Sequence, residues 1–244
     1  MIAILDLPAG GLVACLAIVF VGAIIQSSIG FGLGLVSAPV LGIVDPAFVP
    51  VGVLVAIAPM TIVMATREHH HVDRTGIGWA VLGRVPGTVL GAWVAARADH
   101  STLAFLIAAS VLLAVAASVS GLHVAPNRRN LALAGVASGF GGTAVGIGGP
   151  PMAIAYQNSR PETIRSTLAV FFLMGLAISV VSLAVAGVIG RRELQLGSLL
   201  VVPALLGTLI GGRLSARLPE GKIRPLVLGL CTASAVALIL EQGL

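Results

Sequence analysis

Very few residues of this sequence carry a charge. Asp, Glu, Lys and Arg make up only 9% of the 244 residues, whereas soluble domains have about one quarter. Hydrophobic residues make up 57%, and the mean hydropathy is +1.08. No long polar segment is present that could form a separate soluble domain. The composition therefore excludes a water-soluble protein and predicts an integral membrane protein.

Several chemical signatures are also missing. The two cysteines, Cys15 and Cys231, lie in apolar stretches and are expected to be packing residues without a redox or metal role. No Walker sequence is present, so ATP does not power this chain directly. No Ser-His-Asp set and no Glu/His pair at metal-ligand spacing occurs in the apolar runs. We therefore expect no cofactor, no metal and no enzymatic activity.

The basic residues that are present belong to the segments between apolar runs. The net charge of +5 is explained by the orientation of a membrane protein, and nucleic-acid binding is not expected. His69, His70 and His71 are consecutive and cannot share one helix face, so we expect a solvated loop there.

The apolar runs predict helices that cross a bilayer, which takes about 20 residues each. Strand-like alternation is absent, so we expect an all-α fold. Residues 1–9 contain no Lys or Arg, so the first apolar segment is expected to be retained and not cleaved as a signal peptide. The apolar segments cover residues 10–44, 49–66, 77–96, 102–122, 131–157, 168–190, 196–214 and 225–240.

Two of these segments contain a glycine-rich stretch in which a helix is unstable. They read Gln26-Ser-Ser-Ile-Gly-Phe-Gly-Leu-Gly34 and Gly139-Phe-Gly-Gly-Thr-Ala-Val-Gly-Ile-Gly-Gly-Pro-Pro151. A membrane protein tolerates irregular backbone only where it is buried in protein or lines a cavity. Because helix N-termini expose N–H groups that suit an anion, we expect the two stretches to meet at a solute site near the midplane.

The second half of the chain repeats the first. Small residues four apart favour helix packing on their own, but an added Thr and an Ala-Arg pair at the same offsets indicate duplication. We expect an N-terminal repeat at 1–122, a linker at 123–130 and a C-terminal repeat at 131–244, within one membrane domain. The matching residues are Gly87, Thr88, Gly91, Ala96 and Arg97 against Gly207, Thr208, Gly211, Ala216 and Arg217.

The distribution of Lys and Arg predicts how the chain crosses the membrane. If each glycine stretch crosses once, the basic residues divide almost evenly between the two sides. If each stretch enters and returns as a hairpin, the positive-inside rule is obeyed. We therefore expect two inverted repeats of four elements, each opening with a broken helix or re-entrant hairpin, and both termini outside. One side then holds Arg67, Arg74, Arg128, Arg129, Arg160, Arg165, Arg213, Arg217, Lys222 and Arg224, and the other holds Arg97, Arg191 and Arg192.

Arg84 is the one basic residue placed well inside an apolar run. Such a residue usually faces a cavity, a partner or an ion path, and its guanidinium can hold an oxyanion with two hydrogen bonds. The alternative is that its side chain snorkels to the nearby surface. Arg165 is expected to be a boundary anchor or a contact to substrate. The candidate substrate-binding residues are Gln26, Ser27, Ser28, Gly30, Gly32, Arg84, Thr143, Gly146, Gly148, Gly149, Gln157 and Arg165.

These motifs resemble the sulfite exporter TauE/SafE family of small bacterial membrane transporters. The resemblance rests on 26–39, 135–152, Arg160-Pro-Glu-Thr-Ile-Arg165 before Phe171-Phe172, and Leu206-Gly-Thr-Leu-Ile-Gly-Gly-Arg-Leu214. The first stretch departs from the family pattern by having Gln-Ser-Ser in place of a triple glycine. The resemblance implies export of sulfite or an organosulfonate such as sulfoacetate.

The sequence therefore predicts a secondary transporter that exports a small anionic substrate across the bacterial inner membrane by alternating access. The protein is expected to pass the lipid bilayer several times, and its small-residue helix faces would suit a homodimer or packing within one chain. Two alternatives remain open at this point. One is a membrane-embedded enzyme with a metal centre at His69–His71, and the other is an assembly subunit that transports nothing.

Overall fold

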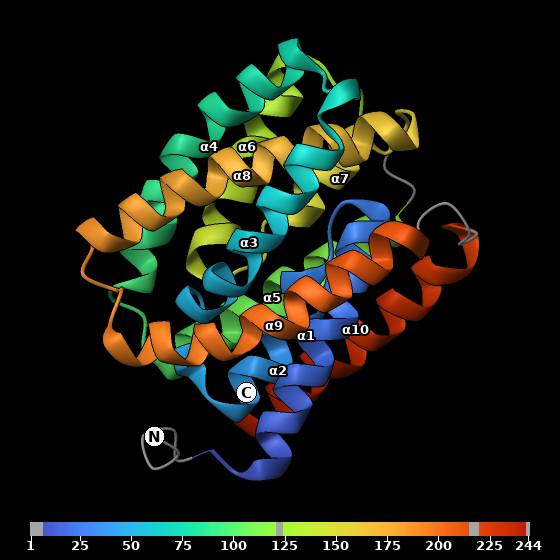
Figure 1. Ribbon diagram of the computed structural model, residues 1–244. Helices are drawn as coiled ribbons and strands as arrows, with labels where there is room; N and C mark the ends of the chain where they lie inside the picture. Colours follow the sequence, from blue (N-terminus) through green and yellow to red (C-terminus); the bar gives the residue numbers. More distant parts are fainter. Residues whose placement is uncertain (1–6, 121–123, 215–219, 243–244) are drawn as a thin grey trace.

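The computed structural model describes residues 7–120, 124–214 and 220–242, and it contains no strand in these ranges (Figure 1). The prediction of an all-α membrane protein is confirmed, since six of the described helices are long and apolar enough to cross a membrane. His123, Ala216 and Arg217 lie outside the described residues. The helices are α1 (Ala9–Ile29), α2 (Leu33–Val44), α3 (Val51–Arg67), α4 (Arg74–Ala95), α5 (His100–Val119), α6 (Arg128–Ala144), α7 (Gly149–Tyr156), α8 (Pro161–Val185), α9 (Arg191–Leu214) and α10 (Glu220–Gln242).

The first glycine stretch ends α1 and turns the chain back into α2. Gly30 and Gly32 have φ angles of 97° and 136°, a region that residues with a side chain rarely adopt. A Cβ on Gly22 would lie 3.1 Å from the Cα of Leu33, and a Cβ on Gly11 would lie 3.0 Å from Val44 Cγ1. Contacts therefore run in opposite directions along α1 and α2, so the two helices form an antiparallel hairpin.

The second glycine stretch does the same between α6 and α7. The helix ends at Ala144, and Gly146 in the turn has a φ angle of 75°. The chain then returns alongside α6, because a Cβ on Gly148 would lie 2.9 Å from the carbonyl oxygen of Ser138 and 3.2 Å from the Cα of Gly142. Both glycine stretches thus break a helix, as the sequence predicts.

The two hairpins open at opposite ends of α3. Asp45, which follows α2 and lies before α3, forms an ion pair with Arg192. The hydroxyl of Tyr156, the last residue of α7, donates a hydrogen bond of 3.0 Å to Asp73, which follows α3. The predicted inverted repeats require such opposite openings, and the repeat assignment itself stays a prediction.

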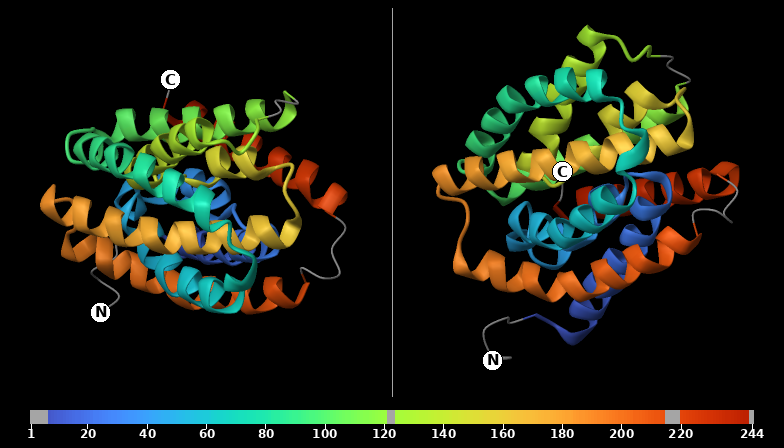
Figure 2. Two further views of the ribbon diagram at one scale, coloured as in Figure 1. Left: turned by 90° about the horizontal axis from the view of Figure 1, so that it is seen from above. Right: turned by 45° about the horizontal axis from the view of Figure 1, so that its top comes forward.

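Helices from one half of the chain pack against helices from the other half. The first helix of each half packs along the fourth helix of the other, so that α1 lies against α9 and α6 lies against α4 (Figures 1 and 2). The repeated glycines make these close approaches possible. A Cβ on Gly87 would lie 2.1 Å from the carbonyl oxygen of Val136, and one on Gly207 would lie 2.4 Å from that of Phe20. No larger side chain fits at either contact.

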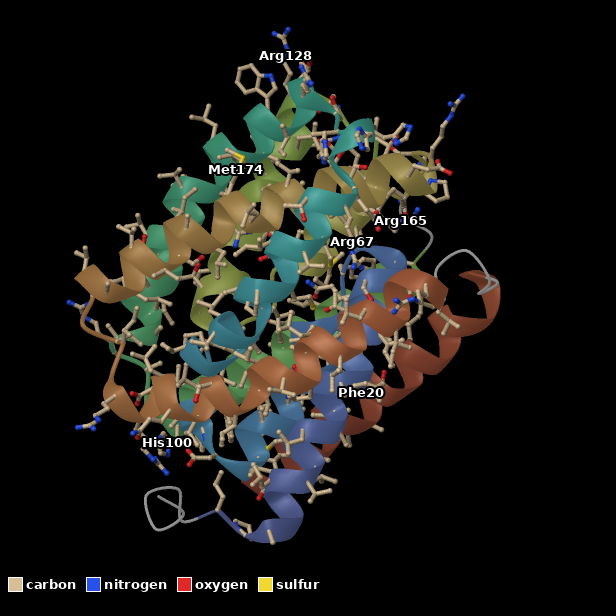
Figure 3. The ribbon with its side chains drawn as sticks, viewed as in Figure 1. Phe20, Arg67, His100, Arg128, Arg165 and Met174 are labelled. Atoms are coloured by element: carbon tan, nitrogen blue, oxygen red, sulfur yellow. The ribbon has the colours of Figure 1, made fainter. Side chains whose placement is uncertain are left out.

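Arginines gather at one end of the bundle, which we call the arginine-rich face. There α3 ends at Arg67, α6 begins at Arg128, and Arg165 lies in the first turn of α8, whereas His100 lies at the opposite end (Figure 3). Arg165 forms an ion pair of 3.0 Å with Glu68. Since basic residues favour the cytoplasmic side, the positive-inside rule predicts that this face is cytoplasmic.

Candidate functional site

The two hairpins touch in the middle of the molecule. A Cβ on Gly34, in the first turn of α2, would lie 1.9 Å from the carbonyl oxygen of Gly146. A Cβ on Gly149, the first residue of α7, would lie 2.9 Å from the Cβ of Phe31. The starts of α2 and α7 are thus brought side by side, each with N–H groups that no preceding helical turn satisfies.

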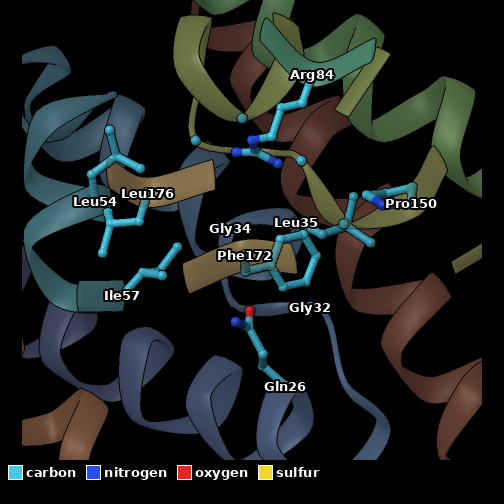
Figure 4. Close-up of a pocket in the computed structure, with 14 residues that line it drawn as sticks. Gln26, Gly32, Gly34, Leu35, Leu54, Ile57, Arg84, Pro150, Phe172 and Leu176 are labelled. Atoms are coloured by element: carbon cyan, nitrogen blue, oxygen red, sulfur yellow. The ribbon is translucent and has the colours of Figure 1, made fainter. Parts of the chain in front are cut away.

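A small cavity of about 40 Å³ lies where the hairpins meet. Space of this size holds a few water molecules or one compact anion. Its walls come from both glycine stretches and from the middles of α3, α4 and α8 (Figure 4). The lining residues are Gln26, Gly32, Gly34, Leu35, Leu54, Ile57, Arg84, Gly142, Gly146, Gly148, Gly149, Pro150, Phe172 and Leu176.

Arg84 is the only charged residue among the described residues of that lining. Its side chain stays inside the protein, only 3% exposed, and does not snorkel to the surface. Its Nη1 donates a hydrogen bond of 3.0 Å to Ser138 Oγ, and its guanidinium carbon lies 4.9 Å from the centre of the Phe171 ring. Among the described residues no carboxylate pairs with Arg84, and its Nε has no hydrogen-bond partner.

Two glycines give the Arg84 side chain its space. A Cβ on Gly175 would lie 2.1 Å from Arg84 Nε, so any larger residue at that position would displace the guanidinium. A Cβ on Gly142 would lie 3.2 Å from Nη2. The surrounding helices are therefore shaped to hold a cation deep in the bundle.

Ser138 links Arg84 to the second hairpin. Its hydroxyl accepts the hydrogen bond from Arg84 and donates one of 2.5 Å to the carbonyl oxygen of Gly148, just before α7. Ser138 is not among the site residues predicted from the sequence. Its position four residues before Gly142, and so on the same helix face, is the signal that could have found it.

If an anion binds beside Arg84 in this cavity, replacing Ser138 with alanine is expected to weaken its binding about tenfold, because the guanidinium loses the bond that orients it and a net hydrogen bond to a charged group is worth about 1.5 kcal/mol or more. Isothermal titration of the purified protein with sulfite measures this, and Ser138→Thr should restore most of the affinity because it keeps the hydroxyl. Ser198→Ala is a matched control, since Ser198 is exposed and bonds only within its own helix. Equal affinity in Ser138→Ala and the unaltered protein would contradict this role.

Gln26 approaches the cavity from the side opposite Arg84 (Figure 4). Its Oε1 accepts a hydrogen bond of 3.0 Å from the N–H of Leu33 and thereby caps the start of α2. Because a backbone N–H needs an acceptor, this bond fixes the orientation of the amide and leaves its NH₂ group as a donor at the cavity.

Residues 14–238 match the family model described as "Sulfite exporter TauE/SafE". The chain belongs to the sulfite exporter TauE/SafE family. This family consists of membrane transporters. No curated protein and no solved structure matches the chain.

In this TauE/SafE protein, half of the predicted site residues line the small cavity and half do not. Gln26, Gly32, Arg84, Gly146, Gly148 and Gly149 line it. Gln157 lines a second, larger cavity. Gly30 lies beside α8, where a Cβ would be 3.5 Å from the Cα of Arg165, and Arg165 itself is held by Glu68.

Three hydroxyl residues predicted as donors face neighbouring helices instead. Ser28 donates a hydrogen bond of 3.2 Å to the carbonyl oxygen of Gly211 in α9, and a Cβ on Gly211 would lie 2.1 Å from Ser27 Oγ. Thr143 shares a hydrogen bond of 2.8 Å with Ser179 in α8. For Ser27 and Ser28 the physical reason is helical geometry. Consecutive residues of a helix point in different directions, and in α1 it is Gln26 that points toward the cavity.

The histidine run of the TauE/SafE protein lies in an exposed turn between α3 and α4. Across the described ranges, no group of three His, Cys, Asp or Glu side chains is placed to share a metal ion.

Proposed function

We propose that this transporter exports a small oxyanion, sulfite or an organosulfonate such as sulfoacetate, from the cytoplasm of a bacterium by alternating access. The observation that carries the proposal is the buried Arg84, which lines a cavity at the middle of the bundle to which the described residues contribute no carboxylate. The description of the family as sulfite exporters supports the proposed chemical class and direction of transport.

An anion in the cavity would balance the positive charge of Arg84. Burying an unpaired charge costs several kcal/mol, and this cost falls when a negative ligand replaces the lost water. Arg84 would supply the positive charge, and Gln26 would donate a hydrogen bond from the opposite wall. The starts of α2 and α7 would contribute N–H groups and the positive ends of their helix dipoles.

Alternating access would come from relative motion of the two hairpins. They contact through glycines at the cavity and open toward opposite faces. In transporters with broken helices, the site sits between such elements and is exposed to one side at a time. Separation of the tips toward either face would open the cavity to that side.

Transport by purified protein in liposomes tests the proposal directly. We expect an outward gradient of sulfite or sulfoacetate to drive flux above that of protein-free vesicles, with slower flux of taurine, which carries no net charge at neutral pH. Sulfate, a larger and doubly charged anion, is tested beside these three compounds. Absence of flux for every anion under both ion and potential gradients would refute the proposal.

A further inference from the structure

A second cavity of about 200 Å³ lies beside the small one. It is enclosed by the turn between α1 and α2 and by α5, α7, α8 and α10. Its lining includes Ser118 near the end of α5, Gln157 after α7 and Ile164 in the first turn of α8. All three positions belong to the ends of helices at the arginine-rich face. The larger cavity therefore extends from the centre of the bundle toward that face.

The two cavities share a wall. Gly32, Leu35 and Pro150 line both of them. The space around Arg84 is only about 40 Å³, enough for a compact head group, whereas the neighbouring space is about 200 Å³. A molecule with its charged head at Arg84 and a substituent longer than the small cavity would reach the larger one at the wall formed by Gly32, Leu35 and Pro150.

The lining of the larger cavity is apolar. Ile29, Phe31, Ile154 and Leu228 contribute to it, and its polar members, Ser118 and Gln157, carry no charge. No Lys, Arg, His, Asp or Glu lines this cavity in the part of the chain that the structure describes. Moving a methylene group from water into such a space is favourable. A second charged group, such as the carboxylate of sulfoacetate, would lose its hydration there without a countercharge.

We infer that the larger cavity binds the apolar substituent of an organic oxyanion whose head group lies at Arg84. This inference rests on the proposed function and makes it more specific. The site selects singly charged anions with a short alkyl chain, such as alkanesulfonates, over sulfoacetate, whose second charge would lie in the apolar cavity.

Binding of a homologous series to the purified full-length chain tests the inference. Methane-, ethane-, propane- and butanesulfonate are titrated beside sulfite and sulfoacetate. Each added methylene that enters the cavity is expected to tighten binding about fourfold, and butanesulfonate should then bind about 60-fold more tightly than methanesulfonate. Sulfoacetate is expected to bind more weakly than propanesulfonate.

A filled cavity should abolish the dependence on chain length. Ala153 lines the larger cavity but not the small one, so Ala153→Phe is expected to lower the ratio of butanesulfonate to methanesulfonate affinity to near 1. Ala116→Phe is the matched control, because Ala116 is an exposed residue of α5 and should leave the ratio unchanged. If Ala153→Phe does not fold, Ile154→Ala removes part of the wall without adding volume and should lower the ratio about threefold.

The possible results have different consequences for this inference and for the proposed function. Sulfite binding with equal affinities along the alkanesulfonate series would overturn this inference and leave the proposed function standing. A chain-length dependence that survives both Ala153→Phe and Ile154→Ala would also overturn it, because the substituent would then bind elsewhere. Failure of sulfite and of every sulfonate to bind would instead reject the proposed function.

Discussion

Replacing Arg84 with alanine is expected to weaken anion binding at least 100-fold. The guanidinium is the only charged group among the described residues that line the small cavity. With an anion bound it would form a buried charge pair, and removing one partner of such a pair costs about 3–5 kcal/mol. Isothermal titration with sulfite and flux into liposomes measure the effect. Arg84→Lys should retain only part of the affinity, because an ammonium group lacks the planar pair of donors that matches an oxyanion.

The stability of the same variant separates a binding role from a structural one. No carboxylate of the described residues pairs with Arg84, and its Nε is buried without a hydrogen bond, so its removal relieves a desolvation cost in the protein without ligand. We therefore expect Arg84→Ala to unfold at a temperature equal to or above that of the unaltered protein.

Arg160→Ala serves as the control for a lost positive charge, since Arg160 is exposed just before α8. It should keep both affinity and flux within about twofold, because exposed charges are screened by water and salt. Normal anion affinity in Arg84→Ala would remove Arg84 from the site.

Replacing Gly34 with alanine is expected to destabilise the contact between the hairpins by about 3 kcal/mol. The added Cβ would lie 1.9 Å from the carbonyl oxygen of Gly146, and that neighbour is backbone in a turn, which cannot move aside as a flexible side chain does. Thermal unfolding of the purified protein in detergent measures the loss. Flux should fall together with stability, because the displaced turn belongs to the wall of the small cavity.

Gly78→Ala is the matched control for this substitution. Gly78 lies in α4, and a Cβ there would meet nothing within 4 Å. The change should raise stability by about 0.5–1 kcal/mol, since alanine favours a helix more than glycine does. Equal unfolding temperatures for Gly34→Ala and Gly78→Ala would contradict the close contact between the hairpins.

The positions of the helices follow closely from the sequence. Long apolar runs fix the membrane class because a helix must hide its backbone from lipid. The predicted segment ends fall within a few residues of most helix ends, but α8, α9 and α10 begin earlier, at Pro161, Arg191 and Glu220 instead of residues 168, 196 and 225. Glycine and proline in two of these runs predict the breaks at 30–32 and 145–148, since local backbone preference suffices there.

The membrane class and the two helix breaks were thus determined by the sequence alone. Whether the Arg84 side chain points inward or snorkels to the surface was decided by the tertiary structure, which buries it beside Ser138. Which neighbours of Gln26 reach the cavity was decided only by the tertiary structure. Ser27 and Ser28 turn toward Gly211, which lies far along the chain, and the rotation of α1 that sets their direction depends on its packing against α9. The bond from Arg84 to Ser138 and the larger cavity likewise arise from contacts between distant helices, which no local pattern encodes.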